Sequence, residues 1–325
     1  MNGKLFNVAG PCVPGKHYML PARERCADIV RLIDNEQFFV LHAARQTGKT
    51  TLLNQLEQEL NAGDDYHALY CSLESVQPFT DPHEGIPAVV RAIRKSVLYH
   101  PVLKEVGFVD ADPLDDISNV VQTGFTSLVC ALDRPLVVLF DEADCLSNGT
   151  LISFLRQLRD GYVNRVRTPF IHSCALVGMR NIRDYTAKVR GDSETLGSAS
   201  PFNIVKKSLT LRNFTREEIA ALYAQHTEET GQTFAESAVD RAHYWTEGQP
   251  WLVNALACEV VEEICDYDPS IDVTEAMIDQ AAQVIIMRRD THIDSLLERL
   301  KEPRVRRVVE PIILGEGADV RRLSN

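Results

Sequence analysis

The sequence predicts an α/β fold, a parallel β-sheet covered by helices, followed by an all-helical region. Two observations carry this prediction. Up to about residue 211, short apolar runs such as 38–43 and 136–140 alternate with amphipathic stretches, which is typical of strand–helix–strand units. After residue 213 only helical periodicity continues. The chain has 325 residues, enough for a core domain and one or two smaller modules.

Five segments have the composition of buried or half-buried strands. They are residues 38–43, 67–72, 136–140, 170–178 and 207–211. Between them, the stretches 52–60, 86–98 and 117–132 are amphipathic and predict helices on the faces of the sheet.

Helix boundaries are readable in the region after residue 213. Thr215 and Glu218 have the spacing of a capping box, Gly231 would end the helix that follows, and Pro250 suits the first position of a later helix. Further helices are expected near 274–287 and 293–300. We therefore expect a core with an N-terminal segment at 1–213, a helical domain at 214–290 and a C-terminal segment at 291–325.

Composition indicates a globular protein. The chain is 45% hydrophobic and 25% charged, it has no apolar stretch near 18 residues, and no signal-peptide pattern follows Met1. Its eight scattered cysteines without a C-x-x-C pair suit free thiols, so we expect a cytoplasmic location and no membrane partner. The net charge of −12 opposes nonspecific nucleic-acid binding, although residues 298–307 are locally basic.

A short loop after the first predicted strand has the pattern of a phosphate-binding loop. Such a loop places backbone N–H groups, a helix N-terminus and an ammonium around one polyphosphate. Gly48 would form the tight turn, Lys49 would contact the β- and γ-phosphates, and Thr50 would bind Mg²⁺. Ala43 replaces the first glycine of the strict pattern, which removes easy access to positive φ there. The residues expected to hold the nucleotide are Ala44, Arg45, Gln46, Thr47, Gly48, Lys49, Thr50 and Thr51.

Two carboxylates follow the apolar run 136–140. At the carboxyl edge of a parallel sheet, Asp141 and Glu142 would lie where open α/β sheets bind ligands. Asp141 is the candidate Mg²⁺ ligand, and Glu142 is the candidate base that orients and deprotonates the attacking water. An acidic helix start is the plainer interpretation of this pair, and the Lys49 loop upstream favours the catalytic one.

The predicted strand 170–178 is followed by Met179 and then by two polar residues, Arg180 and Asn181. A guanidinium at this position can contact the γ-phosphate in two places, so Arg180 is a candidate sensor and catalytic residue. Asn181 is the alternative sensor, and a surface arginine at a strand end is the plainer interpretation.

Together these features resemble the AAA+-related ATPases of the STAND type (signal-transduction ATPases with numerous domains), with origin-recognition ATPases and bacterial AAA-like ATP-binding proteins nearby. The resemblance rests on Lys49, Thr50, Asp141, Glu142, Arg180, the segment 18–24 and the segment 248–250. It implies a P-loop NTPase sheet of the additional-strand, catalytic-glutamate class, with the strand at 170–178 between the two motif strands. It also implies ATP or ADP and Mg²⁺ as cofactors, Arg23 beside the adenine, and a helical lid whose Pro250 packs near the base. Residues from 302 onward look like the beginning of a winged-helix-like module.

The expected function is Mg²⁺-dependent ATP binding and slow hydrolysis that drives a conformational switch in signalling or assembly. Self-association or an unknown protein partner would supply an arginine finger, for which Arg167 and Arg190 are weak candidates on this chain. One alternative is a nucleotide-gated scaffold with negligible hydrolysis, which Ala43 and the resemblance to signalling ATPases favour. The other is a DNA-associated loader or transposition regulator, which only the basic residues 298–307 favour.

Overall fold

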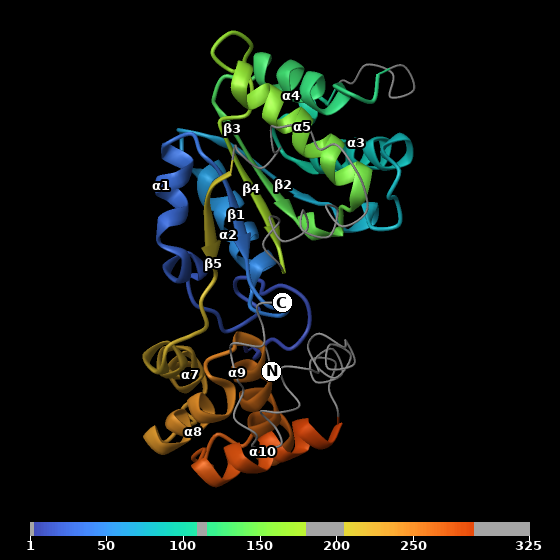
Figure 1. The fold of residues 1–325 in the computed structure, drawn as a ribbon. Helices are drawn as coiled ribbons and strands as arrows, with labels where there is room; N and C mark the ends of the chain where they lie inside the picture. Colours follow the sequence, from blue (N-terminus) through green and yellow to red (C-terminus); the bar gives the residue numbers. More distant parts are fainter. Residues whose placement is uncertain (1–2, 109–115, 180–204, 289–325) are drawn as a thin grey trace. The chain divides into compact units, whose positions relative to one another are not determined.

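The computed structural model describes residues 3–108, 116–179 and 205–288 (Figure 1). These residues form two compact units. One unit comprises residues 11–13 and the described residues from 20 to 213, and it has the α/β architecture. The other comprises residues 3–10, 14–19 and 214–288, and it is helical.

The α/β unit is built on a five-stranded parallel sheet with the order β2-β3-β4-β1-β5. The strands are β1 (Phe38–His42), β2 (His67–Ser72), β3 (Leu136–Asp141), β4 (Ser173–Gly178) and β5 (Val205–Thr210). In the register, Phe38 of β1 pairs with Cys174 of β4, and Val137 of β3 pairs with Ser173. β4 thus lies between the two motif strands β1 and β3, which confirms the prediction.

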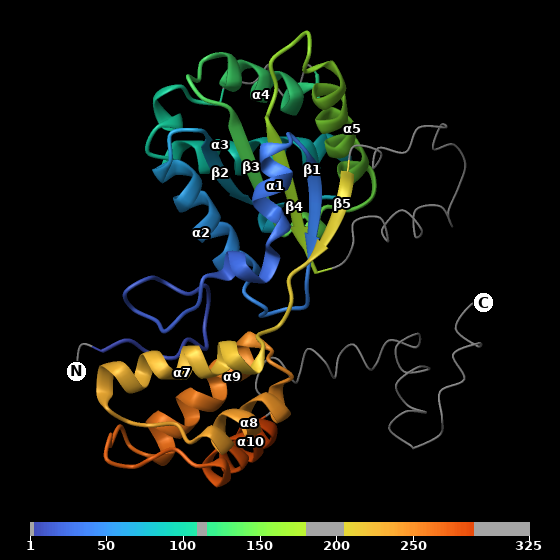
Figure 2. The same cartoon turned by 90° about the vertical axis from the view of Figure 1, so that its left-hand side faces the viewer.

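Helices cover both faces of this sheet (Figures 1 and 2). Phe39 and Leu41 of β1 belong to the core beneath the first two helices, whereas Phe38 and Val40 belong to the core on the other face. This division follows from the strand, in which successive side chains point to opposite faces. The first face carries α1 (Asp28–Asp34) and α2 (Lys49–Ala62), and the second carries α3 (Pro82–Tyr99), α4 (Val120–Cys130) and α5 (Asn148–Asn164).

The described part of this unit also contains four short 3₁₀ turns. They are η1 (Ala22–Cys26), η2 (Glu74–Val76), η3 (Leu103–Glu105) and η4 (Ala143–Cys145). η1 lies against α2, where the Ala22 N–H donates to Gln55 Oε1 at 2.9 Å.

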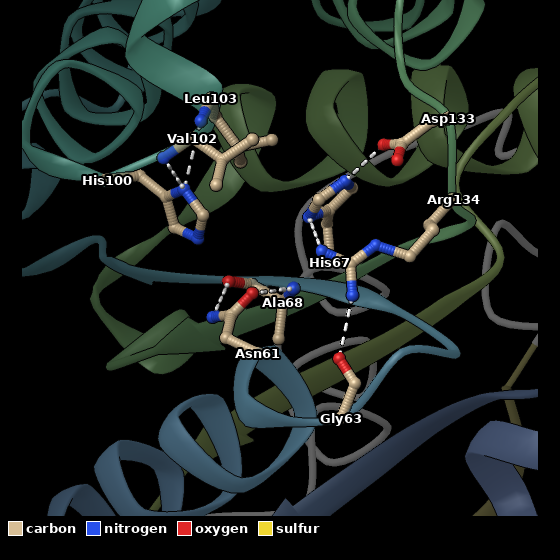
Figure 3. Close-up of polar contacts among 9 residues, drawn as sticks. All are labelled: Asn61, Gly63, His67, Ala68, His100, Val102, Leu103, Asp133 and Arg134. Atoms are coloured by element: carbon tan, nitrogen blue, oxygen red, sulfur yellow. Dashed lines mark hydrogen bonds and ion pairs between the residues drawn. The ribbon is translucent and has the colours of Figure 1, made fainter.

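β2 is an outer strand of the sheet, and side chains from α2 cover part of its open edge (Figure 3). The Asn61 amide donates to Ala68 O at 2.8 Å and accepts from the Ala68 N–H at 3.0 Å, as a neighbouring strand would. One turn earlier, Glu57 Oε1 accepts from the Tyr70 N–H at 2.8 Å. Because bare sheet edges pair with other chains, these contacts protect β2.

A buried histidine joins the start of β2 to its neighbours (Figure 3). Arg134 donates through Nη1 to Gly63 O at 2.7 Å and through Nη2 to His67 Nδ1 at 3.3 Å. Since arginine only donates, Nδ1 is the acceptor, and the Nε2–H of His67 donates to Asp133 at 2.7 Å. The end of α2, the start of β2 and the loop before β3 are therefore tied together.

The helical unit contains the boundaries that the sequence predicts. The Thr215 N–H donates to Glu218 Oε2 at 2.8 Å and the Glu218 N–H donates to Thr215 Oγ1 at 3.2 Å, which confirms the capping box. Gly231 ends the first helix in the left-handed conformation, and Pro250 is the first residue of a later helix. The elements are α7 (Arg216–Thr230), α8 (Glu236–Thr246), α9 (Pro250–Cys258), the π-helix η6 (Glu259–Ile264) and α10 (Glu275–Arg288).

The N-terminal residues 3–10 and 14–19 belong to the helical unit, whereas they are expected in the core from the sequence. Aromatic burial accounts for this difference. The rings of Phe6 and Tyr18 lie 4.8 Å apart, and the Tyr18 hydroxyl lies 3.1 Å from His226 Nδ1 of α7. Trp251 of α9 also donates its Nε1–H to Val8 O at 2.8 Å.

Two predictions concern the C-terminal segment. The helix expected at 293–300 and the winged-helix-like module expected from residue 302 lie outside the described residues. Within the described part of the chain, no helix combines the length and the apolar character needed to cross a membrane.

Candidate nucleotide-binding site

The predicted phosphate-binding loop lies between β1 and α2. Gly48, the N-cap of α2, has a φ of 87°, in the left-handed region that favours glycine. A Cβ added at this position would lie 3.2 Å from Nη2 of Arg25, which is a tight contact. Both backbone conformation and space therefore favour glycine at position 48.

Ala43, which replaces the first glycine of the motif, does not strain the loop. Its φ is not positive, and its side chain is buried in the core beneath α1 and α2. The expected loss of access to positive φ therefore has no consequence at this position. Gln46, which has a φ of 58°, is the non-glycine loop residue in the left-handed region.

The ammonium group of Lys49 is hydrogen-bonded to backbone carbonyl groups of the loop. The Lys49 side chain is buried, and Nζ donates to Ala43 O at 3.1 Å and to Ala44 O at 2.9 Å. Burial lowers the pKa of Lys49, and the carboxylates of Glu142 and Asp141 oppose this shift. Thr47 Oγ1 also donates to Ala44 O at 2.9 Å, while the side chains at 44–46 are exposed.

Asp141, the last residue of β3, is hydrogen-bonded to Thr50 at the start of α2. It is 1% exposed, and its carboxylate accepts three hydrogen bonds. Thr50 Oγ1 donates to Oδ2 at 2.7 Å, the Tyr70 hydroxyl donates to Oδ2 at 3.1 Å, and the Glu142 N–H donates to Oδ1 at 2.9 Å. The structure thus brings together Thr50 and Asp141, the two predicted Mg²⁺ ligands.

Glu142 follows β3 in an unusual backbone conformation. Its φ is 52°, and such a conformation in a residue other than glycine costs about 1–3 kcal/mol and often marks a functional site. Burial raises the pKa of Glu142, as do Asp141 and Asp144, while Lys49 lowers it. Asp144 accepts from the Met179 N–H at 3.0 Å and so connects the end of β3 to the end of β4.

The oxygen donors at this site fit Mg²⁺. A hydroxyl from Thr50 and a carboxylate from Asp141 meet at 2.7 Å. Mg²⁺ in proteins commonly takes one or two carboxylates and completes its shell with water and substrate phosphates. Within residues 3–108, 116–179 and 205–288, no group of three or more His, Cys, Asp or Glu side chains could hold a metal ion by itself. The donor set therefore suits Mg²⁺ bound together with a nucleotide.

Two residues of the site were not predicted from sequence. Arg25 of η1 is 5% exposed, and its Nη2 donates to Thr47 O at 2.6 Å. Tyr70 of β2 reaches Asp141, as described above. No local motif marks either residue, because each contact joins segments that are far apart in the sequence.

Arg23, the predicted adenine-side residue, has a different partner. Its Nη1 lies 2.9 Å from Glu59 Oε2 of α2. Glu59 follows the first residue of α2 by ten positions, which is about 15 Å along a helix. In the described structure the guanidinium of Arg23 is therefore ion-paired on α2, and Arg25 is the arginine that borders the loop.

The remaining predicted residues are dispersed. Thr51 Oγ1 accepts from the Cys12 N–H at 3.1 Å. Pro250 lies in the helical unit, where the Gln249 side chain caps α9 by accepting from the Leu252 N–H at 2.6 Å. Arg167 is exposed and precedes β4, at the amino edge of the sheet. Arg180, Asn181 and Arg190 lie outside the described residues.

Comparisons with known proteins agree with this geometry. Residues 31–185, which include the loop and β3, match a family model described as an AAA domain. A Walker-type ATPase of Pyrococcus abyssi is similar in structure, with a TM-score of 0.67 and 14% identity over 95% of this chain and 83% of that one. No curated protein matches the sequence.

Two further solved structures share the fold. One is the ORC1 protein of Aeropyrum pernix in complex with DNA, with a TM-score of 0.51 and 16% identity over 91% of this chain and 72% of that one. The other is Cdc6p of Pyrobaculum aerophilum, with a TM-score of 0.52 and 14% identity over 81% of this chain and 65% of that one. The family match places an AAA domain at residues 31–185, and the strand order and the loop agree with the fold of an AAA+-related P-loop ATPase.

Proposed function

We propose that this protein binds ATP with Mg²⁺ and hydrolyses it slowly, and that the nucleotide state drives a conformational switch in signalling or assembly, as in STAND-type ATPases. The hydrogen bond of 2.7 Å between Thr50 Oγ1 and Asp141 Oδ2 carries this proposal. It brings the two predicted magnesium ligands, one from the phosphate loop and one from the end of β3, to a single point.

Each residue of the site has a role in this proposal. The loop N–H groups and the Lys49 ammonium would hold the β- and γ-phosphates. Thr50 and Asp141 would hold Mg²⁺, which would offset phosphate charge. Glu142 accepts the proton of the attacking water. Its raised pKa makes it a stronger base than an ordinary glutamate. Arg25 holds the loop through Thr47 O.

Other parts of the proposal rest on the resemblance to STAND-type ATPases. Arg180 would sense the γ-phosphate, Pro250 would lie near the adenine, and the helical region 214–290 would act as the lid. Arg23 would reach the adenine only by leaving Glu59, its partner in the described structure. Turnover would be slow until a second copy or a protein partner supplies an arginine finger, which can add about 10³-fold or more to the rate. A cytoplasmic location belongs to the same proposal.

Two measurements test the proposal. Mass analysis of nucleotide released by denaturing the freshly purified protein should find ATP or ADP, and Lys49→Ala should abolish this retention. A steady-state phosphate-release assay should show slow turnover that Glu142→Gln removes while nucleotide binding persists. Equal phosphate release by the parent and Glu142→Gln would refute hydrolysis at this site.

A nucleotide-gated scaffold is the main alternative. It predicts the same retention of nucleotide but no phosphate release above the Glu142→Gln background. Two sequence arguments favour it, Ala43 and the resemblance to signalling ATPases. The backbone at Ala43 has no positive φ, so the first argument is weakened and the second remains.

A DNA-associated role is the second alternative. Its support is the basic stretch 298–307, which lies outside the described residues, and the net charge of −12 opposes it. Duplex binding at low salt that weakens as salt is raised would support this role, and no binding at low salt would exclude it.

A further inference from the structure

A cavity lies on the α/β unit, between the later turns of α2, the strand β2 and the end of α3. Its volume is about 750 Å³, within the range of roughly 300–1,000 Å³ typical of small-molecule sites. None of the loop residues 43–51 lines it. The lining residues that bear on its chemistry are Glu57, Tyr70, Glu74, Lys95 and Tyr99.

The charge of the cavity wall favours a cation. Glu57 is half-buried, and burial raises the pKa of its carboxyl group. Glu57 Oε1 accepts from the Tyr70 N–H at 2.8 Å, and none of the residues that the structure describes forms an ion pair with this carboxylate. A half-buried carboxylate gains from an opposite charge brought next to it.

The other lining groups agree with this preference. Glu74 adds a second carboxylate, and Lys95 is exposed and forms no ion pair with either glutamate. Tyr99, which also lines the cavity, is 75% exposed, and an aromatic ring can form a cation–π contact. The formal charge of these side chains is therefore negative.

A chain of hydrogen bonds connects this wall to the magnesium carboxylate. Glu57 Oε1 accepts from the Tyr70 N–H at 2.8 Å, and the Tyr70 hydroxyl donates to Asp141 Oδ2 at 3.1 Å. The same Oδ2 atom accepts from Thr50 at 2.7 Å. Tyr70 therefore lines the cavity and also contacts the carboxylate that we assign to Mg²⁺.

We propose that this cavity binds a small organic cation with an ammonium or guanidinium group, held by Glu57, and that Tyr70 couples its occupancy to Asp141. The binding stands independently of ATP hydrolysis. The coupling rests on the proposed function, because it acts through the magnesium carboxylate.

Isothermal titration of the full chain tests the binding, with agmatine and spermidine as probes at low ionic strength and without nucleotide. At least one of them should bind with a Kd below about 1 mM. Glu57→Gln keeps an acceptor for the Tyr70 N–H but removes the charge, so it should weaken binding about tenfold or more. Glu59→Gln is the matched control on α2, where the carboxylate pairs with Arg23, and it should bind like the parent. Absence of binding by both probes, or equal binding by Glu57→Gln and the parent, would overturn the site.

The coupling is tested by the affinity for a non-hydrolysable ATP analogue with Mg²⁺, measured with and without the bound probe. Because coupling between two sites is reciprocal, the probe should shift this affinity and the nucleotide should shift the affinity for the probe by the same factor. Tyr70→Phe should still bind the probe but show no such shift. An unshifted affinity in the parent would overturn the coupling. Failure of the analogue to bind without the probe would instead count against the proposed function.

Discussion

Replacing Gly48 by alanine tests whether the loop is built as described. The left-handed conformation at this position, with a φ of 87°, costs about 1–2 kcal/mol for a residue with a Cβ atom. The new Cβ would also lie 3.2 Å from Nη2 of Arg25, and that group is held at 2.6 Å by Thr47 O. Arg25 therefore cannot move away without weakening its hydrogen bond to the loop.

The strain should appear in one of two measurements. If the loop keeps its conformation, the free energy of unfolding in a urea titration should fall by about 1–2 kcal/mol. If the loop relaxes, stability should persist and affinity for a fluorescent ATP analogue should fall about 5–30-fold, the equivalent of the same energy.

The matched control is Gly63→Ala at the other end of α2. The φ there is −82°, and the nearest atom to an added Cβ is Leu60 O at 3.7 Å, an ordinary contact. This variant should resemble the parent in both measurements. If Gly48→Ala also matched the parent in both, the account of the loop would be wrong.

Three further outcomes are expected. Thr50→Ala should raise the Mg²⁺ concentration needed for tight ATP binding without changing ATP binding in EDTA. The control is Thr51→Ala, because the Thr51 hydroxyl accepts from the Cys12 N–H in the loop before η1. This variant should have the same Mg²⁺ requirement as the parent in the same titration. The rate of phosphate release should fall as the pH drops through the raised pKa of Glu142, because a protonated carboxyl group cannot accept a proton. The midpoint of this fall should lie above the ordinary pKa of glutamate. A midpoint at or below the ordinary pKa would argue against Glu142 as the base. Thr215→Ala removes the hydroxyl that accepts from the Glu218 N–H at the start of α7, so the free energy of unfolding should fall by about 0.5–2 kcal/mol in a denaturant titration. An unchanged free energy of unfolding would contradict the assigned cap.

Strands and caps were well predicted where the pattern is local. The strand at 67–72 was predicted with its observed bounds, and the capping box at Thr215 was confirmed atom by atom. The fifth strand was displaced, since it was expected at 207–211 and runs from Val205 to Thr210. α5 was missed, although it runs from Asn148 to Asn164. Its Asn-Gly start has the composition of a turn, and its packing in the core beneath the sheet overrides that local preference.

The candidate site shows the same limit. Lys49, Thr50 and Asp141 were predicted because each belongs to a short motif with its own spacing. Arg25 and Tyr70 were not, because their contacts with Thr47 and Asp141 span 22 and 71 positions of sequence. These contacts form only in the folded chain, where η1 lies beside the loop and β2 lies beside β3.

The covering of β2 by α2 has a consequence for how copies of this chain can associate. A sheet that continues from one molecule to the next, as in cross-β fibrils, grows by adding a strand to a bare backbone. Here the amide of Asn61 and the carboxylate of Glu57 already occupy backbone positions of Ala68 and Tyr70 that an incoming strand would need. At this edge of the sheet, an incoming strand would first have to displace both side chains, which disfavours association by strand addition here.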